Sequence, residues 1–244
     1  MVVMMAPIEN GHVSRAGEQA SSLILLPLGI TVQNESWGCV AGIDSEGRWL
    51  RPSPIPSDWV CNAEGPFRYK VWSRLTMTPH PTSDRPEDRL IIGNPVLENL
   101  VGPIVYHKLL AAIADPDVCT AFAGIRSVGL IRARVEDIYA RRHTGGRTFL
   151  RVIFKDSANE RFDWIIAELA TAEALGHVRD TATLDHSRAE LWLDQTAASE
   201  VFLAIGLTLP NRAFPGRFGG CHPLVVGVHR VANSNFEGSA SEPN

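Results

Sequence analysis

The hydrophobic residues of this chain gather in short runs that are separated by turns rich in Gly, Pro and Asp. Short apolar or alternating runs with such boundaries are typical of β-strands rather than of helices. Residues 23–28 (LILLPL) predict one strand, because Gly29 ends the run. Residues 37–52 predict a β-hairpin, in which WGCVAGI and RWLRP flank the turn DSEG. Gly47, at the end of that turn, could take a positive φ at little cost.

The rest of the chain continues this pattern, with one helical segment in its first half. Residues 68–78 alternate in polarity and residues 90–92 form a short apolar run, so both predict strands. Apolar residues at helical spacing predict a helix within 99–115, which the Asp-Pro pair at 115–116 would end. The second half predicts a three-stranded meander at 128–140, 148–155 and 161–166. An Ala-rich helix-and-loop segment at 167–200 and two closing strands at 201–207 and 224–231 follow.

This order of elements predicts a mainly β protein. Strands and helices do not alternate as they do in a doubly wound α/β fold. The strands instead suit two small antiparallel OB-like barrels with two or three short helices. We expect the first barrel within residues 23–118 and the second within 119–232, with flexible tails at 1–22 and 233–244.

The hairpin resembles the signature of a known family. The segment GCVAGIDSEGRWLRP is similar to the C-V-A-G-x…G-x-W-x-R-P pattern of bacterial dual OB-domain proteins. Pro81, Arg85, Glu87 and Asp88 stand where that family has Pro-x-x-x-Gln-x-Glu-Asn, and the two closing strands are similar to its terminal strands. The resemblance covers residues 23–231 and implies two OB folds that bind a nucleic acid or nucleotide, with no known reaction. Because Arg85 and Asp88 replace Gln and Asn, a ligand held there would meet a different hydrogen-bond pattern.

A first candidate binding surface follows from the second strand of the hairpin. Alternation along a strand puts Trp49 and Arg51 on one face, with Arg48 and Leu50 on the other. An aromatic ring beside a guanidinium can stack on a base and clamp it. A structural Trp, with Arg51 paired to a nearby carboxylate, explains the same residues. The predicted ligand-binding residues are Arg48, Trp49, Arg51, Arg85, Glu87 and Asp88.

The meander provides a second candidate surface. Residues 126–161 hold nine basic residues against four acidic ones, whereas residues 162–200 hold two basic residues against eight acidic ones. Basic and apolar residues alternate on one face of the strand at 147–155, as in a groove that follows phosphates and stacks bases. A solvated sheet face whose arginines pair with the acidic stretch explains the same pattern. The predicted nucleic-acid-binding residues are Arg132, Arg134, Arg141, Arg142, Arg147, Phe149, Arg151 and Lys155.

The loop at 211–222 is a third candidate, because it is rich in Gly, Pro, Arg and aromatic residues and because loops between barrel strands hold ligands in OB folds. Cys221 and His222 are neighbours there. Adjacent residues of an extended chain point in opposite directions, which disfavours a nucleophile–base pair.

Composition limits the partners. The net charge is −4 and the pI is about 6.1, so binding to nucleic acid requires a local basic patch. The chain has no apolar segment of membrane-spanning length, and residues 1–7 lack the basic region of a signal peptide, so we expect a cytoplasmic protein. Catalytic motifs and metal-ligand spacings are missing from the sequence, so we expect no metal and no cofactor. The four cysteines are widely spaced and are expected to be buried thiols.

Together, these patterns predict a module that binds single-stranded nucleic acid or a nucleotide through arginine–phosphate contacts and base stacking. Two other functions remain open. One is an enzyme that holds a small polar substrate with Arg51, Glu87 and Asp88 in a cleft between the barrels. The other is an adaptor that binds a protein partner at an exposed sheet edge.

Overall fold

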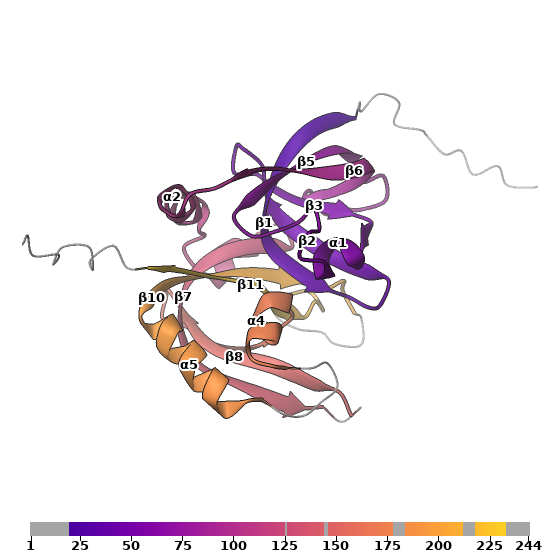
Figure 1. The fold of residues 1–244 in the computed structure, drawn as a ribbon. Helices are drawn as coiled ribbons and strands as arrows, with labels where there is room; N and C mark the ends of the chain where they lie inside the picture. The colour runs from indigo at the N-terminus through magenta and orange to yellow at the C-terminus, as the bar shows by residue number, and fades with distance from the viewer. Residues whose placement is uncertain (1–19, 125, 144–145, 178–183, 212–217, 233–244) are drawn as a thin grey trace, which may run out of the picture.

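The computed structural model describes residues 20–124, 126–143, 146–177, 184–211 and 218–232. In these ranges the chain forms eleven strands and five helices, so the fold is mainly β (Figure 1). The tail predicted at 233–244, and most of the tail predicted at 1–22, lie outside the described residues. Ser21 and Ser22 already belong to the first strand.

Five strands close the first barrel. Strand β1 pairs antiparallel with β2 and with β5, β2 pairs with β3, and β6 joins β5 to β3. The short strand β4 adds to β2 outside the closed ring. The strands are β1 (Ser21–Val32), β2 (Trp37–Ile43), β3 (Trp49–Ser53), β4 (Ile55–Pro56), β5 (Val71–Pro79) and β6 (Asp88–Leu100).

The second barrel repeats this connectivity. Strand β7 pairs with β8 and β10, β8 pairs with β9, and β11 joins β10 to β9. The strands are β7 (Val128–Arg142), β8 (Thr148–Asp156), β9 (Arg161–Ile166), β10 (Ser199–Leu207) and β11 (Pro223–Ala232). In both barrels the third strand runs parallel to the fifth, and the other pairs are antiparallel. Two closed five-stranded barrels with this connectivity fit a tandem OB-like fold.

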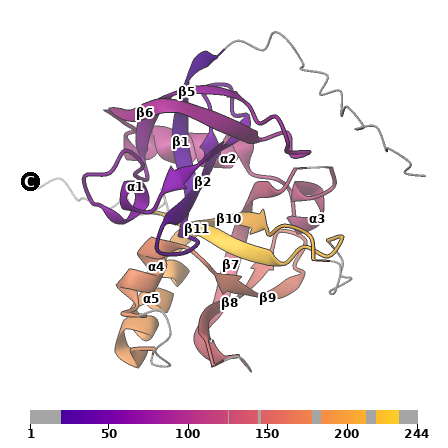
Figure 2. The same cartoon turned by 90° about the vertical axis from the view of Figure 1, so that its right-hand side faces the viewer.

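The helices connect the strands and cover one side of the second barrel. The two longer helices are α2 (Pro103–Ile113), which begins the connection between the barrels, and α5 (His186–Ala197), which packs on β7 and β10. The short helices are α1 (Asp58–Cys61), α3 (Val118–Ala121) and α4 (Leu169–Ala174). Figure 2 shows β10 and β11 at the junction of the two barrels, with α4 and α5 to one side. Among the helices of the described residues, none is long and apolar enough to cross a membrane.

Two local predictions were wrong. The strand predicted at 90–92 extends over Asp88–Leu100, because Gly93 takes a φ of +81° and lets the strand continue where Gly and Pro indicated an end. The four cysteines are free thiols, but they are not the buried thiols that were expected: Cys61 and Cys119 are exposed, and Cys39 and Cys221 are partly exposed. The exposed pair lies on the short helices α1 and α3.

Candidate nucleic-acid interface

The two barrels meet across an apolar core of their own, distinct from the core inside each barrel. In the first barrel, Leu25, Val40 and Leu50 point into the barrel. The residues next to them in the chain, Leu26, Ala41 and Trp49, point outward to the second barrel. Strands β7 and β10 supply the opposite side of this contact. The buried side chains of the inter-barrel core include Leu26, Leu28, Ala41, Ile43, Trp49, Tyr106, Leu110, Val128, Leu130, Phe202 and Ala204.

Glycines let the backbones of the two barrels approach each other closely. A Cβ atom at Gly227 on β11 would lie 1.9 Å from the carbonyl oxygen of Leu28 on β1. A Cβ atom at Gly29 would lie 2.8 Å from a methyl carbon of Val226. Both separations are too short for real atoms, so this crossing of β1 and β11 requires residues without side chains.

Trp49 lies in the inter-barrel core. Its side chain is only 8% exposed, and it packs with Ile43 and with residues of the second barrel. The predicted alternation is confirmed, since Leu50 points into the barrel and Trp49 points out of it. The outward face of this strand, however, is covered, so Trp49 is a structural residue in this arrangement and offers no open surface for stacking a base.

Arg51 lies beside Trp49 and forms an ion pair with Asp88. Its Nε donates to Asp88 Oδ1 at 2.6 Å and one of its terminal nitrogens donates to Asp88 Oδ2 at 2.9 Å. Burial alone would raise the pKa of Asp88, but hydrogen bonds from Arg51 and Ser83 outweigh it and lower that pKa below its ordinary value. The pairing that the sequence offered as the alternative to ligand binding is therefore present.

Glu87 links this ion pair to the second barrel. The backbone N–H of Ser127 donates to Glu87 Oε1 at 2.9 Å, and the Ser127 hydroxyl donates to the same oxygen. Arg51 donates to that hydroxyl at 3.2 Å. The second carboxylate oxygen of Glu87 is buried and has no hydrogen-bond partner among the described residues.

Arg85 makes a second polar link between the barrels. Its guanidinium donates to the carbonyl oxygens of Leu207 and Thr208, at 3.2 and 2.5 Å, where β10 ends. Four of the predicted ligand-binding residues thus converge at the junction of the barrels: Arg51, Arg85, Glu87 and Asp88. They bond to one another and across the junction, so the convergence that the enzyme hypothesis requires is present, with these groups already hydrogen-bonded to the protein.

Arg48 does not join this cluster. It closes the β2–β3 turn by donating from Nε to Asp44 Oδ2 at 2.7 Å, and its side chain is 60% exposed. The six predicted ligand-binding residues therefore divide among an apolar core, a polar junction and an exposed turn.

A second buried polar group lies at the interface, and no pattern in the sequence indicates it. The Tyr106 hydroxyl bonds His229 Nδ1 at 2.8 Å, and His229 Nε2 bonds the Leu28 carbonyl oxygen at 2.8 Å. Since a carbonyl only accepts, Nε2 carries the proton and Nδ1 accepts from Tyr106. Burial lowers the pKa of His229 to about 4, so the ring is neutral near pH 7. Glu168 is buried nearby, and burial raises its pKa.

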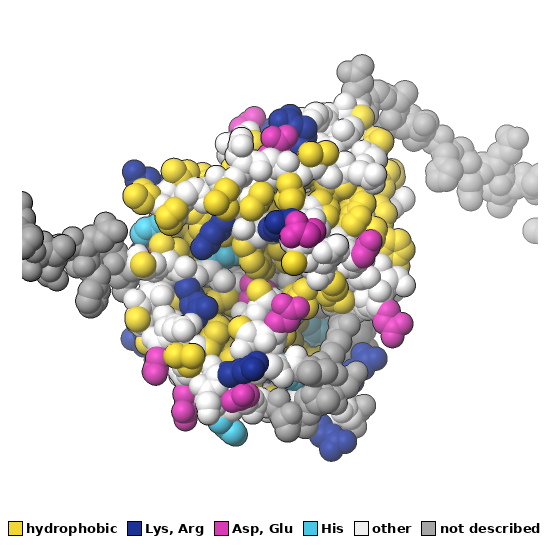
Figure 3. Space-filling view, viewed as in Figure 1, with side chains coloured by type: hydrophobic (Ala, Val, Ile, Leu, Met, Phe, Trp, Pro, Cys, Tyr) yellow, Lys and Arg dark blue, Asp and Glu magenta, His cyan; other side chains and the backbone are white. Residues whose placement is uncertain are grey.

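Half of the predicted nucleic-acid-binding residues form ion pairs. Arg132 pairs with Glu200 at 2.6 Å, and Arg151 pairs with Asp163 at 2.8 Å. Lys155 and Arg134 share Glu136 at 3.0 and 3.6 Å, together with Arg161 at 2.9 Å. In the view of Figure 3, basic and acidic side chains are interspersed in the lower half of the molecule, which the second barrel forms. Acidic partners thus interrupt the basic face, as in the alternative that the sequence left open, although only Arg132 and Arg151 pair with described acids of residues 162–200.

Arg141, Arg142 and Arg147 differ from the other basic residues. They are exposed at the end of the β7–β8 hairpin, and they form no ion pair with any described residue. Phe149 lies directly opposite Arg141 across the two strands and is partly exposed. Its ring contacts the ring of His143 edge to face, with centroids 6.1 Å apart. Arg141 and Arg147 thus share a strand face with an aromatic ring that solvent can reach, and Arg142, opposite Thr148, follows Arg141 at the hairpin end.

The outer face of β8 continues this surface toward β9. Arg151 stands between Tyr139 and Ile165 in the strand pairing. Asp163 holds this part of the face in place, because it accepts from Arg151 at 2.8 Å and from the Tyr139 hydroxyl at 2.7 Å. Burial raises the pKa of Asp163, but these two bonds, together with the positive charges of Arg151 and Arg141, lower it more, so that its net shift is downward. Tyr139 was missed in the sequence, although alternation places it on the same face as Arg141.

The loop at 211–222 is described only at its two ends. Arg212, Phe214 and Arg217 lie outside the described residues. At the base of the loop, Thr208 N–H donates to the His222 carbonyl oxygen at 3.0 Å, and His222 N–H donates to the Thr208 hydroxyl at 2.9 Å. Phe218 packs against Phe122 and Trp164 at the end of the second barrel.

Comparisons with known proteins identify no family. Neither a family model nor a curated protein matches the chain. Among solved structures, the chain is similar to one described as "Structure of murine DNA binding protein bound with ds DNA", with 8% identity and a TM-score of 0.35. The match covers 88% of this chain and 100% of the other. A similarity of this size carries no argument about fold or function.

Proposed function

We propose that this protein binds single-stranded nucleic acid on its second barrel, at the end of the β7–β8 hairpin and on the outer face of β8 and β9. OB folds hold oligonucleotides on the face of their second and third strands and on the loop between the first and second. In the second barrel, these parts are β8, β9 and the hairpin end. The observation that carries the proposal is that Arg141 and Arg147 lie on the face of Phe149, that Arg142 follows Arg141 at the hairpin end, and that none of the three has an ion-pair partner among the described residues.

The side chains divide the work of binding between charge and stacking. The three arginines would contact phosphates, which gives affinity without sequence readout. Phe149 would stack on a base, and Tyr139 with Ile165 would extend the apolar part of the face. Arg151 would add a phosphate contact only after giving up part of its bond to Asp163.

The test is a titration of labelled oligothymidine and oligouridine, followed by fluorescence anisotropy at about 50 and about 200 mM salt. Three phosphate contacts predict that log K falls with log salt with a slope of about −2, since each contact to a single strand contributes about −0.7. Replacing Arg141, Arg142 and Arg147 together by Ala should remove most of this slope and weaken binding at low salt by about tenfold or more.

A matched control replaces Arg134, Arg161 and Arg188 by Ala. All three are exposed and already form ion pairs; Arg134 and Arg161 lie on strands of the second barrel, and Arg188 lies on α5, which packs on it. This variant has the same net charge as the first and should keep nearly all of the affinity. An equal loss in both variants, or binding by the wild type that does not respond to salt, would contradict the proposal.

We also propose that the chain belongs with the bacterial dual OB-domain proteins. The tandem barrels support this assignment, as does the placement of the hairpin residues. Gly47 takes a φ of +77° in the β2–β3 turn, and Trp49 and Arg51 both serve the contact between the barrels. In relatives with the same paired barrels, these three positions should vary less than Phe149, which serves the ligand.

A further inference from the structure

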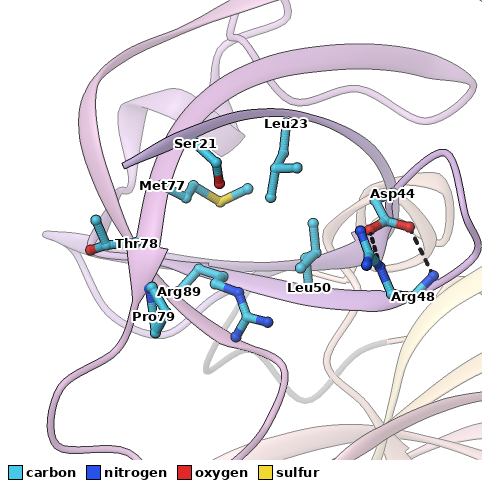
Figure 4. A pocket seen from close by; sticks show the side chains of 9 residues that line it. All are labelled: Ser21, Leu23, Asp44, Arg48, Leu50, Met77, Thr78, Pro79 and Arg89. Carbon is cyan, nitrogen blue, oxygen red and sulfur yellow. Dashed lines mark hydrogen bonds and ion pairs between the residues drawn. The ribbon is translucent and has the colours of Figure 1, made fainter. Parts of the chain in front are cut away.

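The first barrel has a cavity at one end, away from the second barrel's hairpin. Its volume is about 360 Å³, and it is lined by the start of β1, the β2–β3 turn, the end of β5 and the start of β6 (Figure 4). Sites for small molecules occupy roughly 300–1,000 Å³. This cavity is therefore large enough for a small ligand.

The floor of the cavity is the end of the barrel's hydrophobic core. Leu23, Leu50 and Met77 point toward one another across it (Figure 4). Leu50 and Met77 are only 2% and 1% exposed and pack inside the barrel. An apolar chain that enters the cavity would extend this core and leave water at little cost.

The rim of the cavity carries one positive charge that no acid balances. Arg89 donates to the carbonyl oxygens of Pro86 and Asp88, both at 2.7 Å, and forms no ion pair with a described residue. Across the cavity, Asp44 accepts from Arg48 Nε at 2.7 Å and from two backbone N–H groups of its own turn. Arg48 also pairs with Glu46 at 3.1 Å, so this turn holds two carboxylates and one guanidinium, and Arg89 supplies the positive charge on the other side of the rim.

We propose that this cavity binds a small amphipathic anion: a carboxylate with a short apolar chain. The carboxylate bonds Arg89 at the rim, where a planar guanidinium can donate to both oxygens. The chain lies against Leu23, Leu50 and Met77. This site is formed by the first barrel alone and does not depend on the nucleic-acid surface of the second.

The test uses hexanoate as the probe and the methyl resonance of Met77 as the reporter. The chain has four methionines, at positions 1, 4, 5 and 77, so Met77 is the single methionine of the described residues. In protein labelled with ¹³C at the methionine methyl group, hexanoate should shift the Met77 resonance in a saturable way. Hexanol lacks the charge and inorganic phosphate lacks the chain, so each should bind about tenfold more weakly or worse.

Two variants connect the binding to Arg89. Arg89→Gln keeps a donor for the Pro86 carbonyl oxygen but removes the charge, and it should weaken hexanoate about tenfold. Arg74→Gln removes a charge from β5 outside the cavity, where Arg74 pairs with Glu98 at 2.6 Å, and it should leave hexanoate binding unchanged. The proposal is overturned if Met77 does not respond to hexanoate. It is also overturned if hexanol or phosphate binds as tightly, or if both variants lose the same affinity.

Discussion

In the first barrel, the outer surface of the second and third strands carries Ala41, Ile43 and Trp49, and the second barrel covers it. In the second barrel, the same strands carry Phe149, Arg151 and Ile165, which are all partly exposed. The two barrels share one connectivity, yet one of these equivalent faces holds the molecule together and the other is open. Connectivity therefore does not decide what a face does. Its side chains and its neighbours decide it, which is why function has to be argued from the site.

The largest expected effect distinguishes the two aromatic residues of these faces. Trp49→Ala should lower the free energy of unfolding by about 3–5 kcal/mol, because it leaves a cavity in the inter-barrel core. Phe149→Ala should change it by about 1 kcal/mol or less, because the ring is partly exposed. Urea denaturation measures both values.

The same two variants should rank in the opposite order in their effect on nucleic-acid affinity. Phe149→Ala should weaken binding to oligothymidine about tenfold through lost stacking, whereas a folded Trp49→Ala protein should bind like the wild type. A Trp49 variant of normal stability that has lost its nucleic-acid affinity would reverse the comparison.

A second effect is a pH dependence of stability, which arises at the covered contact between the barrels. The pKa of His229 is about 4 in the folded protein, whereas its ordinary value is 6.5. Between these pH values the histidine is protonated in the unfolded chain and neutral in the folded protein. Stability from this group is complete above pH 6.5 and is lost as the pH falls toward 4, by about 3 kcal/mol in total. Urea denaturation at a series of pH values measures this loss.

His229→Gln is the control for that pH dependence, because Gln can still donate to the Leu28 carbonyl oxygen. Glu168 contributes with the opposite sign. Its pKa is raised by burial, so the folded protein takes up its proton at a higher pH than the unfolded chain does. The difference between wild type and His229→Gln isolates the histidine. If the two proteins lose stability in parallel between pH 6.5 and pH 4, His229 is not the cause.

The smallest expected effect concerns the open face. Asp163→Asn should cost less than about 1 kcal/mol of stability, because the ion pair that it breaks is partly exposed. It frees Arg151 for a phosphate, so affinity for oligothymidine should rise and the salt slope should steepen by about 0.7. Glu98→Gln, which frees Arg74 on the first barrel, should change neither. Weaker binding by Asp163→Asn would show that Asp163 positions Arg151 rather than competing for it.

Much of the fold could be predicted because its strands have local signals. The alternation around Leu50, the turn at Gly47 and the three strands of the meander depend on residues close in sequence, and each lies where expected. The parallel pairs that close the barrels join segments far apart in the chain, such as Arg51 with Asp88. No local pattern indicates such a pair, so closure itself had to come from the structure.

The candidate sites were harder to predict because exposure is a property of the whole molecule. Alternation correctly grouped Trp49 with Arg51, but it could not tell that a second barrel covers that face. The same limit applies to Arg151 and Lys155, whose acidic partners come from β9 and β7. Within the meander, Arg141, Arg142 and Arg147 at the end of the β7–β8 hairpin keep no acidic partner among the described residues.

The approach of Gly227 to the carbonyl oxygen of Leu28 gives a means of reading other sequences. Any side chain at that position would collide with the backbone of the other barrel. A chain with these barrels and a larger residue at 227 must therefore orient its two halves differently, and its counterpart of the Trp49 face need not be covered. One position in an alignment could thus separate proteins whose first barrel is covered at the Trp49 face from proteins in which this face of both barrels is free to bind.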